Sequence, residues 1–256
     1  MDIAAYLTRI NYNKPVKPDT GTLRGLQIAH MLSVPFENLD ISLGRKIDLS
    51  EPALWDKLVV RKRGGFCYEL NGLFAWLLRE IGFRVTYLNA RVYNREGKRG
   101  IDFDHLTLLV EIPGQSTRWL ADVGFGDSFL RPLRFKFDEE QADGPRAYRL
   151  GNVGDGIDMW QRNEEAIWER QYFFDLIPRA FSADYEAACI YHQTSPNSSF
   201  TQKRVISLAT PSGRKTLSGL NYILTTNGKR EERVVTEAEY PSLLKEHFRV
   251  ALDTAD

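Results

Sequence analysis

The spacing of apolar residues in the first third of the chain is that of α-helices. It predicts helices over residues 22–32, 54–60 and 67–81. In the last of these segments, apolar side chains recur on one helical face, and Gly82 supplies a C-terminal stop. The members of that face are Leu70, Phe74, Leu77, Leu78 and Ile81. This segment is therefore the most clearly marked helix of the chain.

The apolar period changes from 3.6 to 2 after Gly82, which indicates strands. Three strands are predicted over residues 83–93, 105–112 and 118–123, with turn residues between them. Shorter strands are predicted over residues 134–137, 147–150, 158–161 and 168–176. Consecutive strands joined by short turns favour an antiparallel sheet or small barrel in the middle of the chain.

The last third of the chain mixes both periods. A short helix is predicted over residues 183–192, followed by a break at 196–199. Strands are predicted over residues 204–208, 215–224 and 232–235. Thr236 and Glu239 then have the spacing of a capping pair that starts a terminal helix. The order of elements is thus helices, then strands, then a mixture, which indicates an α+β protein.

Composition excludes several classes of protein. The 256 residues include 34 Lys and Arg against 34 Asp and Glu, so there is no basic surplus that would favour nucleic acid. Only 2 Cys and 4 His are present, which is too few for a disulfide scaffold and shows no zinc-binding spacing. The N-terminal residues lack a secretory pattern, and no apolar run is long enough to span a bilayer. We therefore expect a cytoplasmic protein with reduced thiols, no metal, and neither nucleic acid nor membrane as a partner.

The segment around Cys67 is a candidate nucleophile site. Cys67 falls at the predicted start of a helix, and Gly64 and Gly65 lie just before that start. Unpaired N–H groups and the helix dipole stabilise a thiolate there and can lower a cysteine pKa to roughly 3.5–7.5. The alternative is a buried core cysteine, which is the commoner fate of a lone cysteine in a helix. From this segment alone the two interpretations are about equally supported.

A base and an orienting carboxylate are expected next to each other on a hairpin. His105 opens one predicted strand, and Asp122 closes the next. If they paired directly, the turn would be centred between Pro113 and Gly114, where the turn residues lie. A longer loop would shift the register by one or two residues and would still leave the two side chains as diagonal neighbours. The pattern therefore predicts a histidine–carboxylate pair.

The remaining candidates are weaker. His30, His192 and His247 are interpreted as packed or helix-end histidines, and Cys189 as a core residue. The Gly124–Gly126 segment is a lone G-x-G, which could offer backbone N–H groups to an acyl oxygen or a phosphate. The basic clusters at residues 61–63, 98–99 and 229–230 are most simply solvated turns and helix ends.

Four separated blocks, in order, resemble the arylamine N-acetyltransferase family. They are Val34-Pro35-Phe36-Glu37-Asn38-Leu39, the segment from Arg63 to Asn71 (RGGFCYELN), His105-Leu106-Thr107-Leu108, and Leu120-Ala121-Asp122-Val123-Gly124-Phe125-Gly126. One block would be suggestive, but four in the same order are specific. The resemblance covers roughly residues 20 to 130.

The resemblance implies a fold and its division. It implies a papain-like Cys–His–Asp core on a helical bundle (residues 1–88), a central antiparallel β-barrel (89–192) and a C-terminal α/β lid (193–256). Cys67, His105 and Asp122 would form the catalytic triad.

The resemblance also implies an activity. An acetyl group would pass from acetyl-coenzyme A to Cys67, in a ping-pong mechanism, and then to an aromatic amine or hydrazine, in xenobiotic metabolism. We expect Gly124, Phe125 and Gly126 to contact the cofactor. Phe66, Tyr68 and Phe125 would form an aromatic wall for the acceptor, although core packing explains these three residues equally well.

Two other classes of function remain open. A papain-like or transglutaminase-like thiol hydrolase uses the same three residue types, with water as the acceptor. A ligand-binding protein without enzymatic activity would leave Cys67 unreactive. The acceptor, the acyl-chain length and the oligomeric state are not determined by the sequence.

Overall fold

The computed structural model describes residues 1–163 and 165–252. The N-terminal part consists mainly of helices. Their bounds are α1 (Ile3–Arg9), α2 (Thr20–Ser33), α3 (Leu39–Ser42), α4 (Glu51–Trp55), the π-helical turn η1 (Asp56–Val60) and α5 (Cys67–Ile81). The helices predicted over residues 22–32 and 67–81 are confirmed. The predicted helix over 54–60 is instead the end of α4 followed by η1.

An antiparallel sheet of eight strands forms the central region, in the order β5-β4-β3-β2-β9-β8-β7-β6. The bounds are β2 (Arg84–Val92), β3 (His105–Glu111), β4 (Arg118–Ala121), β5 (Leu133–Arg134), β6 (Gln141–Asp143), β7 (Arg146–Asn152), β8 (Ile157–Arg162) and β9 (Trp168–Phe174). The side chain of Gln141 spans the gap between the two edge strands. It accepts from the N–H of Arg134 at 2.7 Å and donates to its carbonyl at 3.0 Å. The sheet thus curls into a near-barrel.

The C-terminal sheet has the order β1-β10-β11-β12-β13. Its strands are β1 (Phe36–Glu37), β10 (Val205–Thr210), β11 (Gly213–Ser218), β12 (Asn221–Thr226) and β13 (Lys229–Val234). The single strand predicted over residues 215–224 is wrong, because Gly219 turns the chain with a φ of 60° and divides the segment into β11 and β12. Strand β1 comes from the helical part of the chain. Its pairing with β10 therefore joins the N-terminal helices to the C-terminal sheet.

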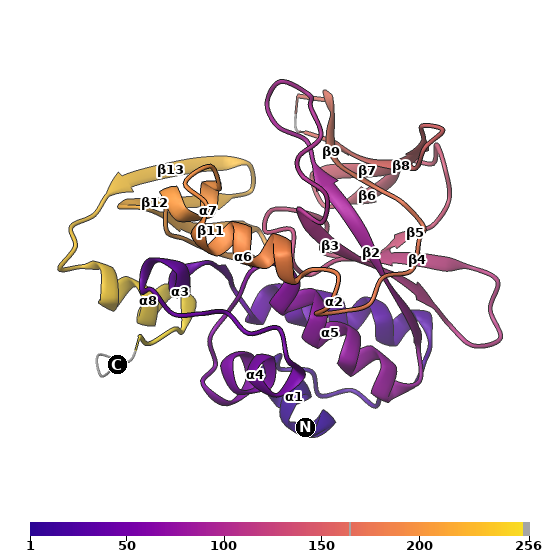
Figure 1. The fold of residues 1–256 in the computed structure, drawn as a ribbon, viewed down its shortest axis with the longest axis horizontal. Helices are drawn as coiled ribbons and strands as arrows, with labels where there is room; N and C mark the ends of the chain where they lie inside the picture. The colour runs from indigo at the N-terminus through magenta and orange to yellow at the C-terminus, as the bar shows by residue number, and fades with distance from the viewer. Residues whose placement is uncertain (164, 253–256) are drawn as a thin grey trace.

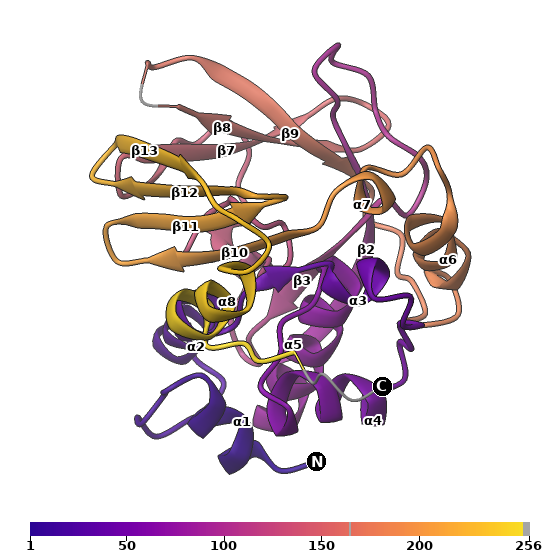
Figure 2. The ribbon, with the colours of Figure 1, turned by 90° about the vertical axis from the view of Figure 1, so that its left-hand side faces the viewer.

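Three helices accompany this sheet: α6 (Glu186–Thr194), α7 (Ser199–Gln202) and α8 (Tyr240–Phe248). The predicted break at residues 196–199 separates α6 from α7, and α7 begins at its last residue. Figure 1 shows the C-terminal sheet to the left of the near-barrel, and Figures 1 and 2 both show α5 beneath β3. Leu73, Phe74 and Leu77 of α5 are fully buried against the apolar face of β3 in one core cluster. Within the described residues, no helix has the length and apolar character needed to cross a membrane.

Candidate functional site

The nucleophile candidate is the first residue of α5. Cys67 begins the helix after Phe66, and the Glu69 side chain accepts a hydrogen bond from the Phe66 N–H at 3.1 Å. The loop before the helix lies tightly against β1: a side chain at Gly64 would lie 2.1 Å from the Pro35 carbonyl oxygen. Glycine is therefore required there, and the helix start is held at a fixed place.

A buried network of charges lies behind this helix start. Lys57 contacts the carboxylates of Glu69 and Asp40, each at 2.7 Å. Arg63 contacts Glu37 at 2.7 Å and Asp40 at 3.0 Å. All five side chains are at most 8% exposed. The expectation that the basic cluster at residues 61–63 is solvated is therefore wrong for Arg63.

The five charges depend on one another. Burial alone would raise the pKa of Asp40, but the charges of Lys57 and Arg63 outweigh burial and lower it. Burial likewise opposes the charge of Lys57, yet the three carboxylates raise its pKa. Removal of one member would leave an uncompensated buried charge, which is strongly destabilising. The network therefore ties β1, α3, η1 and the start of α5 together.

The predicted histidine–carboxylate pair is present. The Nε2 atom of His105 lies 2.7 Å from the Oδ2 atom of Asp122, and both side chains are at most 2% exposed. The β3–β4 register pairs Leu108 with Ala121, two residues away from the direct pairing of His105 with Asp122. The loop after β3 is thus longer than two residues. As the alternative register required, His105 and Asp122 are diagonal neighbours.

Asp122 is surrounded by hydrogen-bond donors. Its Oδ1 atom accepts from the Asn71 side chain and from the Gly124 N–H, each at 2.9 Å. Its Oδ2 atom also accepts from the Tyr172 hydroxyl at 3.1 Å. Burial raises the pKa of this carboxyl, but His105 and the other donors outweigh burial and lower it. Asp122 is therefore ionised, and His105 donates to it through Nε2, which leaves Nδ1 free to accept a proton.

Asn71 joins the two halves of the site. It lies one helical turn after Cys67, donates to the Leu106 carbonyl at 2.6 Å as well as to Asp122, and accepts from the Val123 N–H at 2.9 Å. On the other side, a side chain at Gly124 would lie 2.8 Å from the Cα atom of Cys67. The helix start and the histidine hairpin are thus in direct contact.

The sequence interpretation did not identify Asn71 and Tyr172 as site residues. The signal for Asn71 is its spacing of four residues from Cys67, which places both on one helical face. Tyr172 lies in a predicted strand that is about 50 residues after Asp122 in the sequence. No motif in that strand indicates that Tyr172 belongs to the site.

Comparison with known proteins agrees with this geometry. An N-acetyltransferase family model matches residues 19–256. An arylamine N-acetyltransferase of Mycolicibacterium smegmatis is 38% identical over 235 residues, which are 90% of this chain and 85% of the relative. The human arylamine N-acetyltransferase 1 is 36% identical over 98% of this chain and 95% of its own length. The chain belongs to the arylamine N-acetyltransferase family.

A solved structure confirms the fold of this arylamine N-acetyltransferase. The Mycobacterium marinum arylamine N-acetyltransferase in complex with CoA superposes with a TM-score of 0.90 at 33% identity, over 97% of this chain and 93% of that chain. The predicted α+β class, with N-terminal helices, a central antiparallel near-barrel and a C-terminal sheet with helices, is therefore confirmed. The boundaries at residues 88 and 192 stay a prediction.

The thiol of the enzyme differs from the sequence expectation in one respect. Burial raises the pKa of Cys67 well above its ordinary value. The Leu106 N–H lowers this pKa, whereas the carboxylates of Asp104 and Asp122 raise it. The expectation of a lowered pKa, based on the helix start alone, is therefore wrong for the isolated thiol. Ionisation of Cys67 requires a base nearby that takes its proton.

The residues predicted to contact substrates differ in their exposure to solvent. Phe66 and Tyr68 are fully buried, and the Tyr68 hydroxyl donates to the Phe103 carbonyl at 2.6 Å. Phe125 and Gly126 are partly exposed, and Gly124 is buried. The Phe125 ring lies with its centroid 5.1 Å from that of His105. Of the three predicted aromatic residues, Phe125 is thus the one that is both open to solvent and next to the base.

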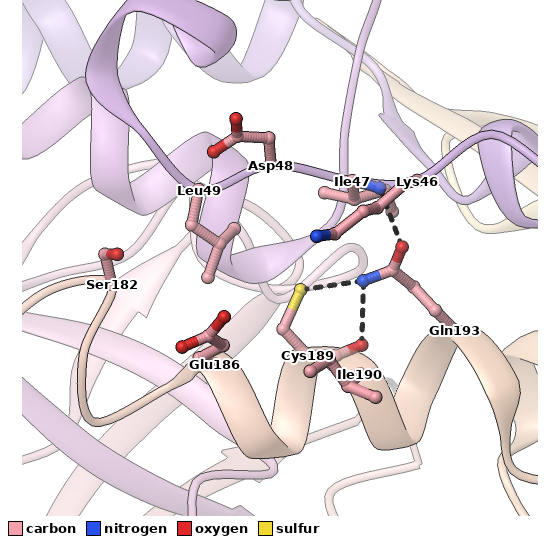
Figure 3. Close-up of a pocket in the computed structure, with 9 residues that line it drawn as sticks. All are labelled: Lys46, Ile47, Asp48, Leu49, Ser182, Glu186, Cys189, Ile190 and Gln193. Carbon is pink, nitrogen blue, oxygen red and sulfur yellow. Dashed lines mark hydrogen bonds between the residues drawn. The ribbon is translucent and has the colours of Figure 1, made fainter.

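The second cysteine has different surroundings. Cys189 is 1% exposed, which confirms its interpretation as a buried residue, and its sulfur contacts the Gln193 side-chain amide at 3.2 Å. It lines a cavity of about 160 Å³ between α6 and the segment 46–49 (Figure 3). Burial raises the pKa of this thiol to about 12. No histidine lines this cavity among the described residues.

Proposed function

We propose that this enzyme transfers an acetyl group from acetyl-CoA to aromatic amines and hydrazines through a thioester on Cys67. The observation that carries the proposal is the contact between the start of α5 and a hairpin whose His105–Asp122 pair spans 2.7 Å. Family membership and the CoA complex of the M. marinum relative support the donor.

The first half of the reaction would begin with the transfer of the Cys67 proton to Nδ1 of His105. The ionised Asp122 holds the Nε2–H tautomer and stabilises the resulting imidazolium. The thiolate attacks the carbonyl carbon of the thioester. Backbone N–H groups at the start of α5 would stabilise the negative oxygen that forms. The coenzyme A thiolate then leaves and takes the proton from His105, so Cys67 carries the acetyl group.

In the second half, the nitrogen of the amine attacks the acetyl carbon on Cys67. His105 takes a proton from that nitrogen as the amide bond forms, and the Cys67 thiolate leaves. The thiolate regains a proton from His105. Phe125 would offer a ring face to a flat acceptor, and Gly124–Gly126 would contact the donor. The free thiols of the chain suit the cytoplasm, where we expect the enzyme to work.

Mass spectrometry of the protein incubated with acetyl-CoA alone tests the proposal. We expect one acetyl group, on the peptide that contains Cys67, with release of coenzyme A. A Cys189→Ala variant should become acetylated like the wild type, because no histidine among the described residues lines the cavity of that thiol. Release of the acetyl group to water, with no dependence on an added arylamine, would support a thiol hydrolase instead. Absence of acetyl-Cys67 in folded protein would contradict the covalent mechanism.

A further inference from the structure

A second contact between a histidine and a carboxylate lies next to the proposed triad: the histidine is buried and the carboxylate is partly exposed. The Nε2 atom of His192, on α6, lies 3.3 Å from the Oδ1 atom of Asp104, the residue directly before His105. The side chains are 6% and 19% exposed. The Nδ1 atom of His192 is 3.1 Å from the Ser198 hydroxyl. The Nε2–Oδ1 approach is a polar contact without hydrogen-bond geometry, so Nε2 is a buried polar atom that has no hydrogen-bond partner within the described residues.

Asp104 holds the turn that leads into β3. Its Oδ2 atom accepts from the Val92 N–H at 3.1 Å. A side chain at Gly100 would lie 2.3 Å from the same oxygen, so the carboxylate lies closely against the backbone there. Asp104 therefore contacts β2, the turn before β3 and α6 at once.

The residue between these contacts has a strained backbone. Phe103 has a φ of 60°, which is uncommon for a residue other than glycine. Its N–H donates to the Asn89 side chain at 2.7 Å, and its carbonyl accepts from the Tyr68 hydroxyl at 2.6 Å. Such strain persists only where surrounding contacts over-determine it, and it is common at functional sites. Because Tyr68 follows Cys67, this turn connects the nucleophile to the strand of the base.

We propose that Asp104 and His192 are positioning residues for this chemistry: they fix the turn before His105 and keep a partly buried carboxylate next to the base. This inference rests on the proposed function, because it assigns a role relative to the Cys67–His105 pair. The pair orients and polarises the reacting groups and does not itself contact the acetyl group.

The charge of Asp104 acts on the thiol. Among the carboxylates around Cys67, that of Asp104 raises the pKa of the thiol most, ahead of Asp122. Other titratable and charged side chains surround the two groups from each packed element. They are Tyr68 on α5, His105 on β3, Asp122 after β4, Tyr172 on β9, Arg179 before α6, Tyr185 at its start, and Cys189 and His192 on it.

The pH dependence of Cys67 alkylation by iodoacetamide tests the role of the charge without requiring acetyl-CoA. In Asp104→Asn the midpoint of the rate profile should move to lower pH, by about half to one unit, because the nearby negative charge is gone. Asp102→Asn is the matched control: it removes a charge from the same turn, but its side chain is 69% exposed. Its midpoint should match that of the wild type. An unmoved midpoint in Asp104→Asn, or an equal shift in both variants, would overturn the role of the charge.

Two substitutions at His192 test the positioning role and serve if Asp104→Asn fails to fold. His192→Gln keeps a polar N–H group that can lie near Asp104, whereas His192→Leu keeps volume without a polar group. We expect Cys67 acetylation to stay within about 3-fold of the wild type in the first variant and to fall about 10-fold in the second, both measured in protein that melts cooperatively. Equal acetylation rates in the wild type and His192→Leu would overturn the positioning role. If the wild type alkylates with the expected profile but never accepts an acetyl group, the proposed function fails while the role of the charge at Cys67 stands.

Discussion

Cys67 and His105 lie on opposite sides of the site, and different kinds of interaction hold them in place. On the nucleophile side, a network of full charges that includes Lys57 and Arg63 is buried behind the helix start. On the base side, the single carboxylate of Asp122 accepts hydrogen bonds from groups that are neutral or titratable.

This difference has a consequence for substitutions. A charge removed from the first side leaves another buried charge unpaired, so folding should suffer. An isosteric change at Asp122 removes a charge but keeps the shape, so the chemistry should suffer while the fold remains. The two sides of one site should therefore respond differently to variants of similar size.

The largest effect on chemistry is expected from Asp122→Asn. The amide oxygen would turn toward the Asn71 and Gly124 donors, so the amide NH₂ would face Nε2 of His105 and favour the tautomer with the proton on Nδ1. That tautomer cannot take the Cys67 proton. Acetylation of Cys67 should slow by roughly 10²- to 10⁴-fold, measured by stopped-flow release of coenzyme A.

Tyr172→Phe is the control for this prediction. It removes one donor to Asp122 and leaves the charge in place. One hydrogen bond to a charged group contributes about 1.5–3 kcal/mol, so we expect a loss of at most roughly 10- to 150-fold, smaller than that of Asp122→Asn. Wild-type acetylation rates in folded Asp122→Asn would remove Asp122 from the mechanism and would end the contrast between the two sides.

The next largest effect, on stability, is expected from Arg63→Met. The substitution leaves Glu37 and Asp40 without one of their buried partners, so the free energy of unfolding should fall by about 3–5 kcal/mol. For a domain of this size the melting temperature should drop by roughly 6–20 °C. Thermal unfolding followed by circular dichroism measures it.

Arg61→Met is the matched control for Arg63→Met. Arg61 lies two residues away and pairs with Asp56 at 2.7 Å, but both side chains are exposed. Its loss should cost at most about 1 kcal/mol. Similar stabilities of the two variants would show that the buried network does not hold the nucleophile side.

The parts of the site that could be predicted from the sequence are those held by contacts between neighbouring segments. The base side was predictable because strand periodicity and one turn place His105 and Asp122 on a hairpin, and a register error of two residues still leaves them adjacent. The helix start at Cys67 was predictable from the apolar face of α5 and the preceding glycines. Local pattern is sufficient where the interaction is local.

The rest of the site depends on contacts between distant segments. The pairing of β1 with β10 joins residues about 170 positions apart, and no pattern within two residues of strand could show it. In the sequence, Lys57 and Arg63 cannot be distinguished from basic residues that are exposed to solvent. Only the tertiary fold buries them. The raised pKa of Cys67 has the same origin, because this residue is buried by segments distant in sequence, such as the loop at Gly124.

The smallest expected effect concerns a histidine on the nucleophile side that stays uncharged. His30 is fully buried, its Nδ1 atom is 3.0 Å from the Tyr6 hydroxyl, and burial, aided by the charge of Arg9, lowers its pKa to about 3. The unfolded chain binds a proton at this position near pH 6.5, whereas the folded enzyme does not, so stability is lost as pH falls below about 6.5 and continues to fall toward 3. Between pH 7 and pH 5 the wild type should lose about 2 kcal/mol more than His30→Gln, by urea unfolding at each pH. Tyr6→Phe keeps the histidine and should keep the wild-type slope. If the unfolding free energies of the wild type and His30→Gln had the same dependence on pH, His30 would gain its proton in the folded enzyme. An unpaired charge would then be tolerated on the nucleophile side.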